Sequence, residues 1–357
     1  MIAIRVVPLA NLHKEICSKR QDVPEAGEMD KHLPGAKDSH SHHKSHDGRL
    51  MENYDVIIVG AGPSGLFCAI NSMQKGKKIL ILEKKNSPGH KLLISGSGHC
   101  NITHDGNIQD FLDHFGDKGH GRFLRPALLG FKNSDLIYFF KSLGLNMIRE
   151  KGDKIFPETL QARDVLNILT SQCRALGIVI KCNHAVRSIT RKEEGFLVGC
   201  EGGSYSSRLL VIATGGCSYP ATGSTGDGYR FASLLGHRIT EIGPALTPLL
   251  IKDYPFSELA GLSFSDMKIS LYRHAKIREH RGDVLLTHQG LSGPGILDLS
   301  RYIRAGDVVK LSFVPEDKRE ALEEWLIDVA RLDGRRSLMS MLADLPRFLA
   351  SSVSSSV

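Results

Sequence analysis

Residues 54–83 read YDVIIVGAGPSGLFCAINSMQKGKKILILE, and this stretch decides the fold class of the chain. The apolar run at 55–59 predicts a buried strand. Glycines interrupt residues 60–65, residues 66–75 predict a helix closed by Gly76, and residues 78–83 predict a second strand. Strand, turn, helix and strand in this order are the unit of a parallel sheet, so the sequence predicts an α/β fold.

The turn of this unit has the glycine spacing Gly60-x-Gly62-x-x-Gly65. Gly60 permits a tight turn, Gly62 lets the backbone approach a pyrophosphate, and Gly65 permits close packing of helix on strand. The free N–H groups and the positive dipole end of the following helix favour a phosphate there. The alternative is a glycine turn without a ligand in an ordinary α/β domain.

An acidic residue supports the dinucleotide interpretation. Glu83 ends the second predicted strand, 18 residues after Gly65. A carboxylate at this position accepts hydrogen bonds from both ribose hydroxyls of an adenosine and repels a 2′-phosphate. We therefore expect a Rossmann-like domain that binds FAD or NAD rather than NADP at this site.

Two further glycine-rich segments lie outside the unit. Residues 89–103, GHKLLISGSGHCNIT, would let backbone N–H groups approach a flat polar ring, with a surface loop as the alternative. Residues 211–229 form a predicted strand that ends in ATGG, a Gly/Thr/Ser loop, and the start of a helix capped by Thr225 or Asp227. Gly215 and Gly216 would let the chain pass close to a cofactor at the carboxyl ends of the strands, and a turn without a ligand is the alternative.

Together these motifs resemble one family. The most specific are KLLISGSGHCN at 91–101 and ATGGCSYPATGSTGDG at 213–228, and GPALTPL at 243–249 and LTHQGLSGP at 286–294 also fit its pattern. Over about residues 54–300, the chain resembles the bacterial NAD(P)/FAD-dependent oxidoreductases with two dinucleotide-binding motifs, a family with aminoacetone-oxidase-like and bile-acid-reductase-like members.

The resemblance implies an FAD-binding domain with an inserted, smaller β-rich domain that begins near Pro244. It implies that FAD contacts residues of four segments, with Val186 offering its backbone to the adenine. The implied contacts are Gly60, Gly62, Ser64, Gly65 and Glu83 to the ADP half, Lys91, Leu92, Ser95, Gly96, Gly98, Cys100 and Asn101 to the pyrophosphate and flavin, and Thr214, Gly215 and Gly216 beside the cofactor.

The chain departs from the family pattern at three places. Residues 1–50 have no counterpart in the family pattern, and His99 stands where the family often has Arg. The strand, turn and closing helix with which the family returns to the FAD domain are not found before Val357. We therefore expect a disordered, His-rich extension at 1–50, an FAD-binding domain at 51–243 and an incomplete β-rich substrate domain with helices at 244–357. The histidines near residues 40–46 are interpreted as part of the tail, and no metal site is predicted.

Composition limits the partners that we expect. The net charge is +7, and the basic residues are scattered without interleaved aromatics, which indicates a solvated surface rather than a nucleic-acid interface. The seven cysteines form no C-x-x-C pair, as is usual for reduced thiols in the cytoplasm. No apolar run is long enough for a membrane span, and no signal peptide is evident. We expect a cytoplasmic protein with neither nucleic acid nor membrane as partner, in an oligomeric state that we leave open.

The predicted activity is that of an FAD-dependent oxidoreductase. Hydride would pass through the flavin to or from a small organic substrate, for example an enone such as a steroid, with NAD(P)H as a candidate donor. Tyr219 and His288 are candidate proton donors, and Cys100 and Cys217 are interpreted as packing residues. Two alternatives stay open: a flavin amine oxidase that uses oxygen, and a truncated, non-catalytic remnant. An RNA-modifying flavoprotein is disfavoured by the absence of a basic aromatic surface.

Overall fold

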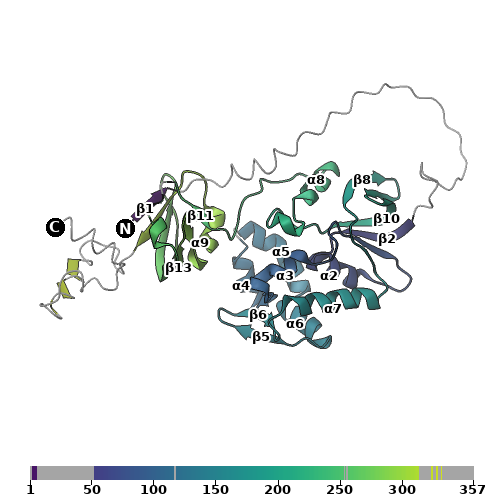
Figure 1. Cartoon of the computed structure of the whole chain (residues 1–357), viewed down its shortest axis with the longest axis horizontal. Coiled ribbons are helices and arrows are strands. Elements are labelled where there is room, and N and C mark those ends of the chain that lie inside the picture. The colour runs from purple at the N-terminus through teal and green to yellow at the C-terminus, as the bar shows by residue number, and fades with distance from the viewer. Residues whose placement is uncertain are drawn as a thin grey trace, which may run out of the picture. The chain divides into compact units, whose positions relative to one another are not determined.

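A computed structural model describes residues 2–5, 52–115, 118–252, 254 and 256–312, together with 323, 324, 327, 328 and 331. The chain divides into two compact units (Figure 1). We call Gly35–Thr240 the central unit, and Met1–Pro34 with Glu241–Val357 the terminal unit. Among the described residues, none of the helices is both long and apolar enough to cross a bilayer.

The central unit is built on a six-stranded sheet in the order β7-β3-β2-β10-β9-β8. The strands are β2 (Glu52–Val59), β3 (Ile79–Leu82), β7 (Val179–Lys181), β8 (Val186–Lys192), β9 (Gly195–Cys200) and β10 (Gly203–Ile212). The first four strands in this order are parallel to one another. Strand β9 pairs antiparallel with β10, and β8 pairs antiparallel with β9. The predicted parallel sheet is therefore confirmed.

Helices and a small second sheet surround this sheet. The helices are α2 (Pro63–Ser72), α3 (His90–Ile94), α4 (Ile108–Asp113), α5 (Lys118–Gly130), α6 (Asn133–Ser142), α7 (Ala162–Ala175) and α8 (Asp227–Leu234). The second sheet has the order β4-β6-β5, with β4 (Thr103–His104), β5 (Met147–Glu150) and β6 (Lys154–Pro157).

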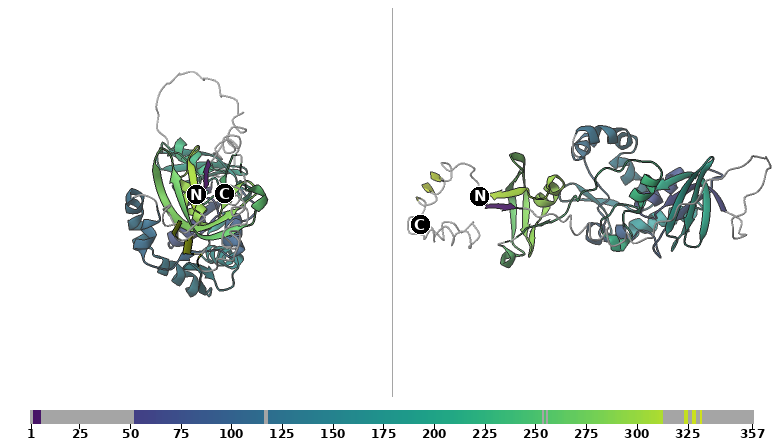
Figure 2. Two further views of the ribbon diagram at one scale, coloured as in Figure 1. Left: turned by 90° about the vertical axis from the view of Figure 1, so that its left-hand side faces the viewer. Right: turned by 90° about the horizontal axis from the view of Figure 1, so that it is seen from above.

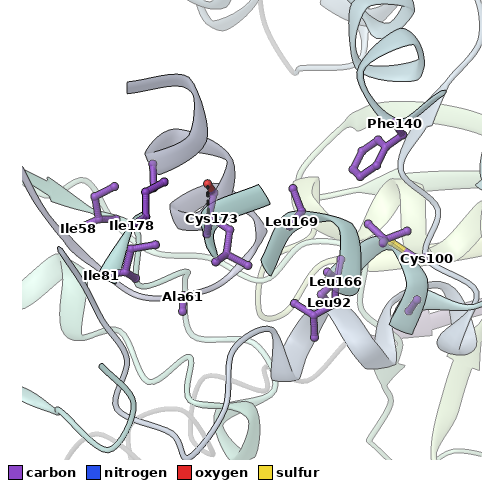
Figure 3. Close-up of a cluster of buried hydrophobic side chains, with 14 of the residues drawn as sticks. Ile58, Ala61, Ile81, Leu92, Cys100, Phe140, Leu166, Leu169, Cys173 and Ile178 are labelled. Carbon is purple, nitrogen blue, oxygen red and sulfur yellow. Dashed lines mark hydrogen bonds between the residues drawn. The ribbon is translucent and has the colours of Figure 1, made fainter. Parts of the chain in front are cut away.

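Both faces of the parallel strands are buried, because side chains alternate along a strand. Ile58 and Ile81 are paired in register and point into one cluster with side chains of α2 and α7 (Figure 3). In this cluster the thiol of Cys173 lies 3.8 Å from the carbonyl oxygen of Leu66. Ile57 and Leu80 point to the opposite face, into a cluster that includes Phe231 of α8.

The terminal unit is an antiparallel sheet in the order β1-β15-β12-β13-β14-β11. Its elements are β1 (Ile2–Arg5), β11 (Leu249–Leu250), β12 (Ser263–Tyr272), β13 (Lys276–Leu286), β14 (Gly290–Ser292), α9 (Pro294–Leu299) and β15 (Val308–Ser312). Helix α9 packs against β13 (Figure 2). The core contains Ile269, Leu271, Leu286, Ile296 and Leu311, all fully buried.

Several elements differ from those expected. Residues 2–5 lie within the predicted disordered extension, yet they form β1, paired with β15. The helix expected from residue 66 begins at Pro63, because proline suits the first helical position. The sequence also predicts a strand at 209–213 and helices at 318–332 and 338–348. The strand corresponds to the end of β10, which begins at Gly203. The two helices lie almost wholly outside the described residues.

Candidate functional site

The glycine turn after β2 is fixed by three close backbone approaches. Gly60 has φ +108°, and a Cβ there would lie 2.5 Å from the carbonyl oxygen of Ala213. Its N–H donates to the carbonyl of Leu82 at 2.8 Å. A Cβ on Gly65 would lie 2.0 Å from the carbonyl oxygen of Gly60, so α2 starts directly against the turn. These two positions require glycine for the fold itself.

The fold itself does not require glycine at position 62. It is extended, with φ −73° and ψ 175°, and a Cβ there would meet no atom within 4 Å. Helix α2 follows with Pro63 in its first turn, no side-chain cap and no acidic residue. Ser64 is exposed in the same turn. An open helix N-terminus beside open space is a site for an anion, and a pyrophosphate fits it.

The carboxylate of Glu83 accepts two backbone N–H groups at the end of the site where an adenosine would lie. Its Oε2 accepts the N–H of Ala61 and its Oε1 accepts the N–H of Lys85, both at 2.8 Å. Each carboxylate oxygen has a second lone pair, so Glu83 can still accept ribose hydroxyls. The N–H of His184 donates to the carbonyl of Glu83, which brings the β7–β8 connection alongside. Val186 begins β8, two residues further on, with its side chain in the core.

The predicted flavin-contact segment has an unusual backbone. Gly96, Ser97, Gly98 and Cys100 all have positive φ, between 54° and 90°. Two internal hydrogen bonds hold it, from His99 N–H to Gly96 O and from Cys100 N–H to Ser95 O, each 3.0 Å. A backbone with successive positive φ values is concave and suits the approach of an anion or a polar ring edge, with the N–H groups of His99 and Cys100 used inside the segment. Non-glycine residues in this region carry strain, which is typical of ligand sites.

Two residues predicted to line the cofactor have buried side chains. Leu92 and Cys100 belong to the core cluster beneath α7 (Figure 3). Burial raises the pKa of the Cys100 thiol, and a hydrogen bond with Ser95 opposes this only in part. These two residues can therefore offer backbone groups to a ligand but not side chains. Among the remaining positions, Gly96 and the side chain of Asn101 are exposed and Ser95 and Gly98 are partly exposed.

A lysine joins the two glycine-rich segments. The Nζ of Lys91, on α3, donates to the Oγ of Ser218 at 3.0 Å. Burial lowers the pKa of Lys91, against a smaller opposing effect of Cys217. A Cβ on Gly215 would lie 2.9 Å from the Oγ of Ser224, and the carbonyl of Gly216 accepts a backbone N–H of the same loop. The structure thus brings together residues 89–103 and 211–229, as a shared ligand requires.

A second link was not expected from the sequence. Lys84 Nζ donates to Asp227 Oδ2 at 2.6 Å and to Thr225 Oγ1 at 2.7 Å. The helix cap predicted at Thr225 or Asp227 is wrong, because Gly226 is the N-cap and no side chain caps it. Burial alone would raise the pKa of Asp227, but the hydrogen bond and charge of Lys84 hold it below its ordinary value. The signal in the sequence was a lysine directly after Glu83.

The two candidate proton donors lie in different units. Tyr219 follows Ser218 in the central unit, is 66% exposed and has φ +52°. His288 is exposed in the β13–β14 connection of the terminal unit. The structure does not bring the two residues into one described site. Among the described residues, no group of three or more His, Cys, Asp or Glu side chains could hold a metal ion.

This fold and site define a Rossmann-type dinucleotide-binding protein of the flavoprotein class. The family described as the HI0933-like protein Rossmann domain matches residues 54–313, and the chain belongs to this family of FAD-binding oxidoreductases. The resemblance inferred from the motifs is thereby confirmed.

Three relatives have names that state an activity. The chain is 29% identical over 306 residues to the ribosomal RNA dihydrouridine synthase of Escherichia coli, covering 84% of this chain and 73% of that protein. It is 30% identical over 269 residues to the 3-dehydro-bile acid delta(4,6)-reductase of Clostridium scindens, and the match covers 73% of this chain and 64% of that protein. The Haemophilus influenzae ribosomal RNA dihydrouridine synthase is 27% identical, covering 76% and 67%. The chain thus spans about two thirds to three quarters of these relatives.

The residues present fit FAD. The open space at Gly62 and the uncapped start of α2 suit the pyrophosphate, and Glu83 suits the ribose. The concave backbone at 96–100 and the loop at 214–216 suit the ring end. When bound, FAD supplies the capacity to accept and donate a hydride.

Proposed function

We propose that the chain is an FAD-dependent reductase of a carbon–carbon double bond conjugated with a carbonyl group. The observation that carries the proposal is the Lys91–Ser218 hydrogen bond, which joins the two segments that would flank the flavin. The named products or substrates of the relatives support the reaction type, since dihydrouridine and a reduced bile acid both arise by saturating such a bond.

In this reaction one carbon of the double bond receives a hydride and its neighbour receives a proton. The electron pair would derive from NADH or NADPH. Lys91 would place a positive charge beside the polar edge of the flavin and hold the loop that carries Tyr219. Tyr219, next in sequence to Ser218, is the proposed proton donor. His288 is a second candidate, from the terminal unit.

The first substrate class is a small enone such as a 3-keto steroid. The similarity to the reductase of C. scindens, which is 30% identical, supports this class. The second is a uridine within RNA, whose C5=C6 bond is also conjugated with a carbonyl. The similarity to the E. coli ribosomal RNA dihydrouridine synthase, over 84% of this chain, favours it.

The test begins with the visible spectrum of the purified chain, with and without added FAD. We expect a flavin band that bleaches under anaerobic NADH or NADPH and returns on addition of the correct acceptor. The acceptors are a 3-keto-4-ene steroid and unmodified ribosomal RNA, with mass spectrometry of the products. The proposal would be refuted if the chain binds no FAD. It would also be refuted if neither acceptor reoxidises the reduced flavin and only oxygen does. Oxygen consumption with small amines would instead indicate an amine oxidase.

A further inference from the structure

Helix α5 exposes large apolar side chains next to arginines. Phe123 is 84% exposed and Leu129 is 48% exposed, while Arg122, Arg125 and Pro126 are also exposed. We call these five residues the α5 surface. Among the large apolar side chains of the described residues, Phe123 is the most exposed, and Leu129 lies on the same helix, so the two form an apolar patch rather than a single exposed residue.

The helical repeat places the five residues on one outer arc. At about 100° per residue, Arg125, Leu129, Arg122, Pro126 and Phe123 follow one another around the helix over about 160°. The opposite side packs inward: Gly121 is buried, and a Cβ there would lie 3.0 Å from the carbonyl oxygen of Leu112 on α4. The α5 surface is therefore continuous and faces away from the neighbouring helix.

This surface is also basic without acidic compensation. Residues 118–134 contain lysines, arginines and a histidine but no aspartate or glutamate. Among the described residues, neither Arg122 nor Arg125 forms an ion pair within 4.0 Å. The nearest helix, α4, contributes Asp110, which is exposed at its first turn. Two guanidinium groups around an exposed aromatic ring form a surface complementary to a polyanion that also has flat apolar faces.

We propose that the α5 surface binds single-stranded RNA, with a base stacked on Phe123 and the flanking phosphates held by Arg122 and Arg125. Proteins bind single strands with aromatic rings placed among cationic side chains. The cations contact the phosphates, and the rings stack on the bases, because every base has a flat face. The proposal rests on the RNA arm of the proposed function, and it adds where the RNA is held. The expectation of basic residues without interleaved aromatics does not hold here, because Phe123 stands between Arg122 and Arg125.

The mixed arrangement argues against a membrane. A helix that lies in a lipid interface segregates its cations from its apolar side chains on opposite faces. On the α5 surface, Arg122 lies between Leu129 and Pro126 on the arc. This alternation suits the alternating phosphates and bases of a single strand better than a flat lipid boundary.

The test measures fluorescence anisotropy of a labelled single-stranded RNA of about 12 nucleotides with the FAD-loaded full chain. Phe123→Ala should weaken binding about tenfold with little change in salt dependence. The double variant R122Q/R125Q should weaken binding and lower the slope of log Kd against log salt by about 1.4. All three side chains are exposed, so folding should be retained.

The matched control is R191Q/K192Q, which removes the same charge from two exposed residues of β8. Control binding near wild type, with loss in both α5 variants, supports the proposal. Equal loss in the control, or no RNA binding by the wild type, overturns it. Phe123-dependent binding to anionic vesicles or self-association, without RNA binding, also overturns it. Retained enone reduction with no RNA binding refutes this inference alone, whereas RNA binding without any reductase activity refutes the proposed function alone.

Discussion

Gly62 and Gly65 lie in the same turn but have different surroundings. The Cβ of an alanine at position 62 would enter open space, whereas at position 65 it would meet the carbonyl oxygen of Gly60 at 2.0 Å. One glycine leaves space for a ligand and the other leaves space for the chain itself. The glycine spacing predicts this division, and the structure adds the distances: open space at position 62 and a backbone contact at position 65.

Gly62→Ala should separate binding from stability. Its φ of −73° suits an L-residue, so we expect the free energy of unfolding to change by less than about 0.5 kcal/mol. The affinity for FAD should fall at least about tenfold, because the methyl group takes the space of the pyrophosphate. Flavin fluorescence titration and thermal melting without FAD measure the two effects.

Gly65→Ala is the matched control, and it should lower the melting temperature by several degrees before FAD is added, since backbone must move. Equal FAD affinity in Gly62→Ala and wild type would contradict the assignment of this space to the cofactor.

Tyr219→Phe should lower turnover with the correct acceptor by about 10²-fold if its hydroxyl supplies the proton. Because Tyr219 is 66% exposed, the substitution should leave folding and FAD affinity unchanged. The measurement is single-turnover reoxidation of the reduced flavin over a range of pH. The control is His288→Asn, and a larger effect there would move the proton donor to the terminal unit.

The thiols give a test that needs no cofactor. Burial raises the pKa of Cys173 to about 11 and also raises that of Cys100. Both should therefore resist a thiol reagent at pH 8 in the folded chain and react after denaturation. Mass spectrometry of the labelled peptides identifies each site. Rapid native labelling of Cys100 would show that it faces solvent or ligand rather than the core.

At the scale of elements, the ion pair between β3 and α8 shapes the adenosine end of the site. Lys84 follows the last residues of β3, and Asp227 is the first residue of α8, so their contact ties the loop at 214–226 to the strand ends. Neither side chain needs to touch the cofactor. The pair acts by positioning the loop that would lie beside it.

Asp227→Asn should cost stability only where the carboxylate is charged. The folded-state pKa is lowered, so the contribution is present above the unfolded value of about 3.9 and is lost as pH falls through the folded value. We expect the melting temperature to fall by about 2–4 °C at pH 7, with the difference from wild type shrinking as the pH falls below the unfolded pKa of about 3.9. Asp110→Asn, also in a first helical turn, is the control for the helix dipole. A difference that stays constant as the pH is lowered through this acidic range would contradict the ion-pair explanation.

The elements show how far the sequence predicts this fold. The sequence predicts a strand at 179–181, which are the bounds of β7, and a helix at 163–176, which is α7 within one residue at each end. A short apolar run and an amphipathic repeat leave few alternatives. Helices α4 and α5 were not predicted: Lys118–Gly130 contains three glycines and a proline, which suggest loop. The side-chain links at Lys91 and Lys84 join residues more than 120 positions apart, and no local pattern contains that information.

At the scale of the whole molecule, two hydrophobic cores support two units. The Rossmann-type core belongs to the central unit, and the terminal sheet buries its own cluster around Ile269 and Leu311. The predicted domain boundary at residue 243 lies within three residues of the observed division after Thr240. Each unit can therefore lose stability without loss of the other.

Deletion of residues 1–5 tests this independence. It removes β1, one of the two strands that pair with β15, so the amides of Val308–Leu311 that face β1 should exchange hydrogen faster while the pairing with β12 remains. FAD content should not change, because no residue of the predicted cofactor site lies in this unit. Hydrogen-exchange mass spectrometry and the flavin spectrum report the two results. Loss of FAD in the deletion variant would show that the units depend on each other.

The pairing of β1 with β15 sets an order in time. Residues 2–5 leave the ribosome well before Val308–Ser312, which emerge only after about 300 further residues have been made, and this takes about 15–60 s at 5–20 residues per second. The central unit ends at Thr240, so it can fold before the terminal unit has its complete sheet. During that interval β1 has no partner, and the chain carries an unsatisfied strand that a chaperone or a second nascent chain could capture.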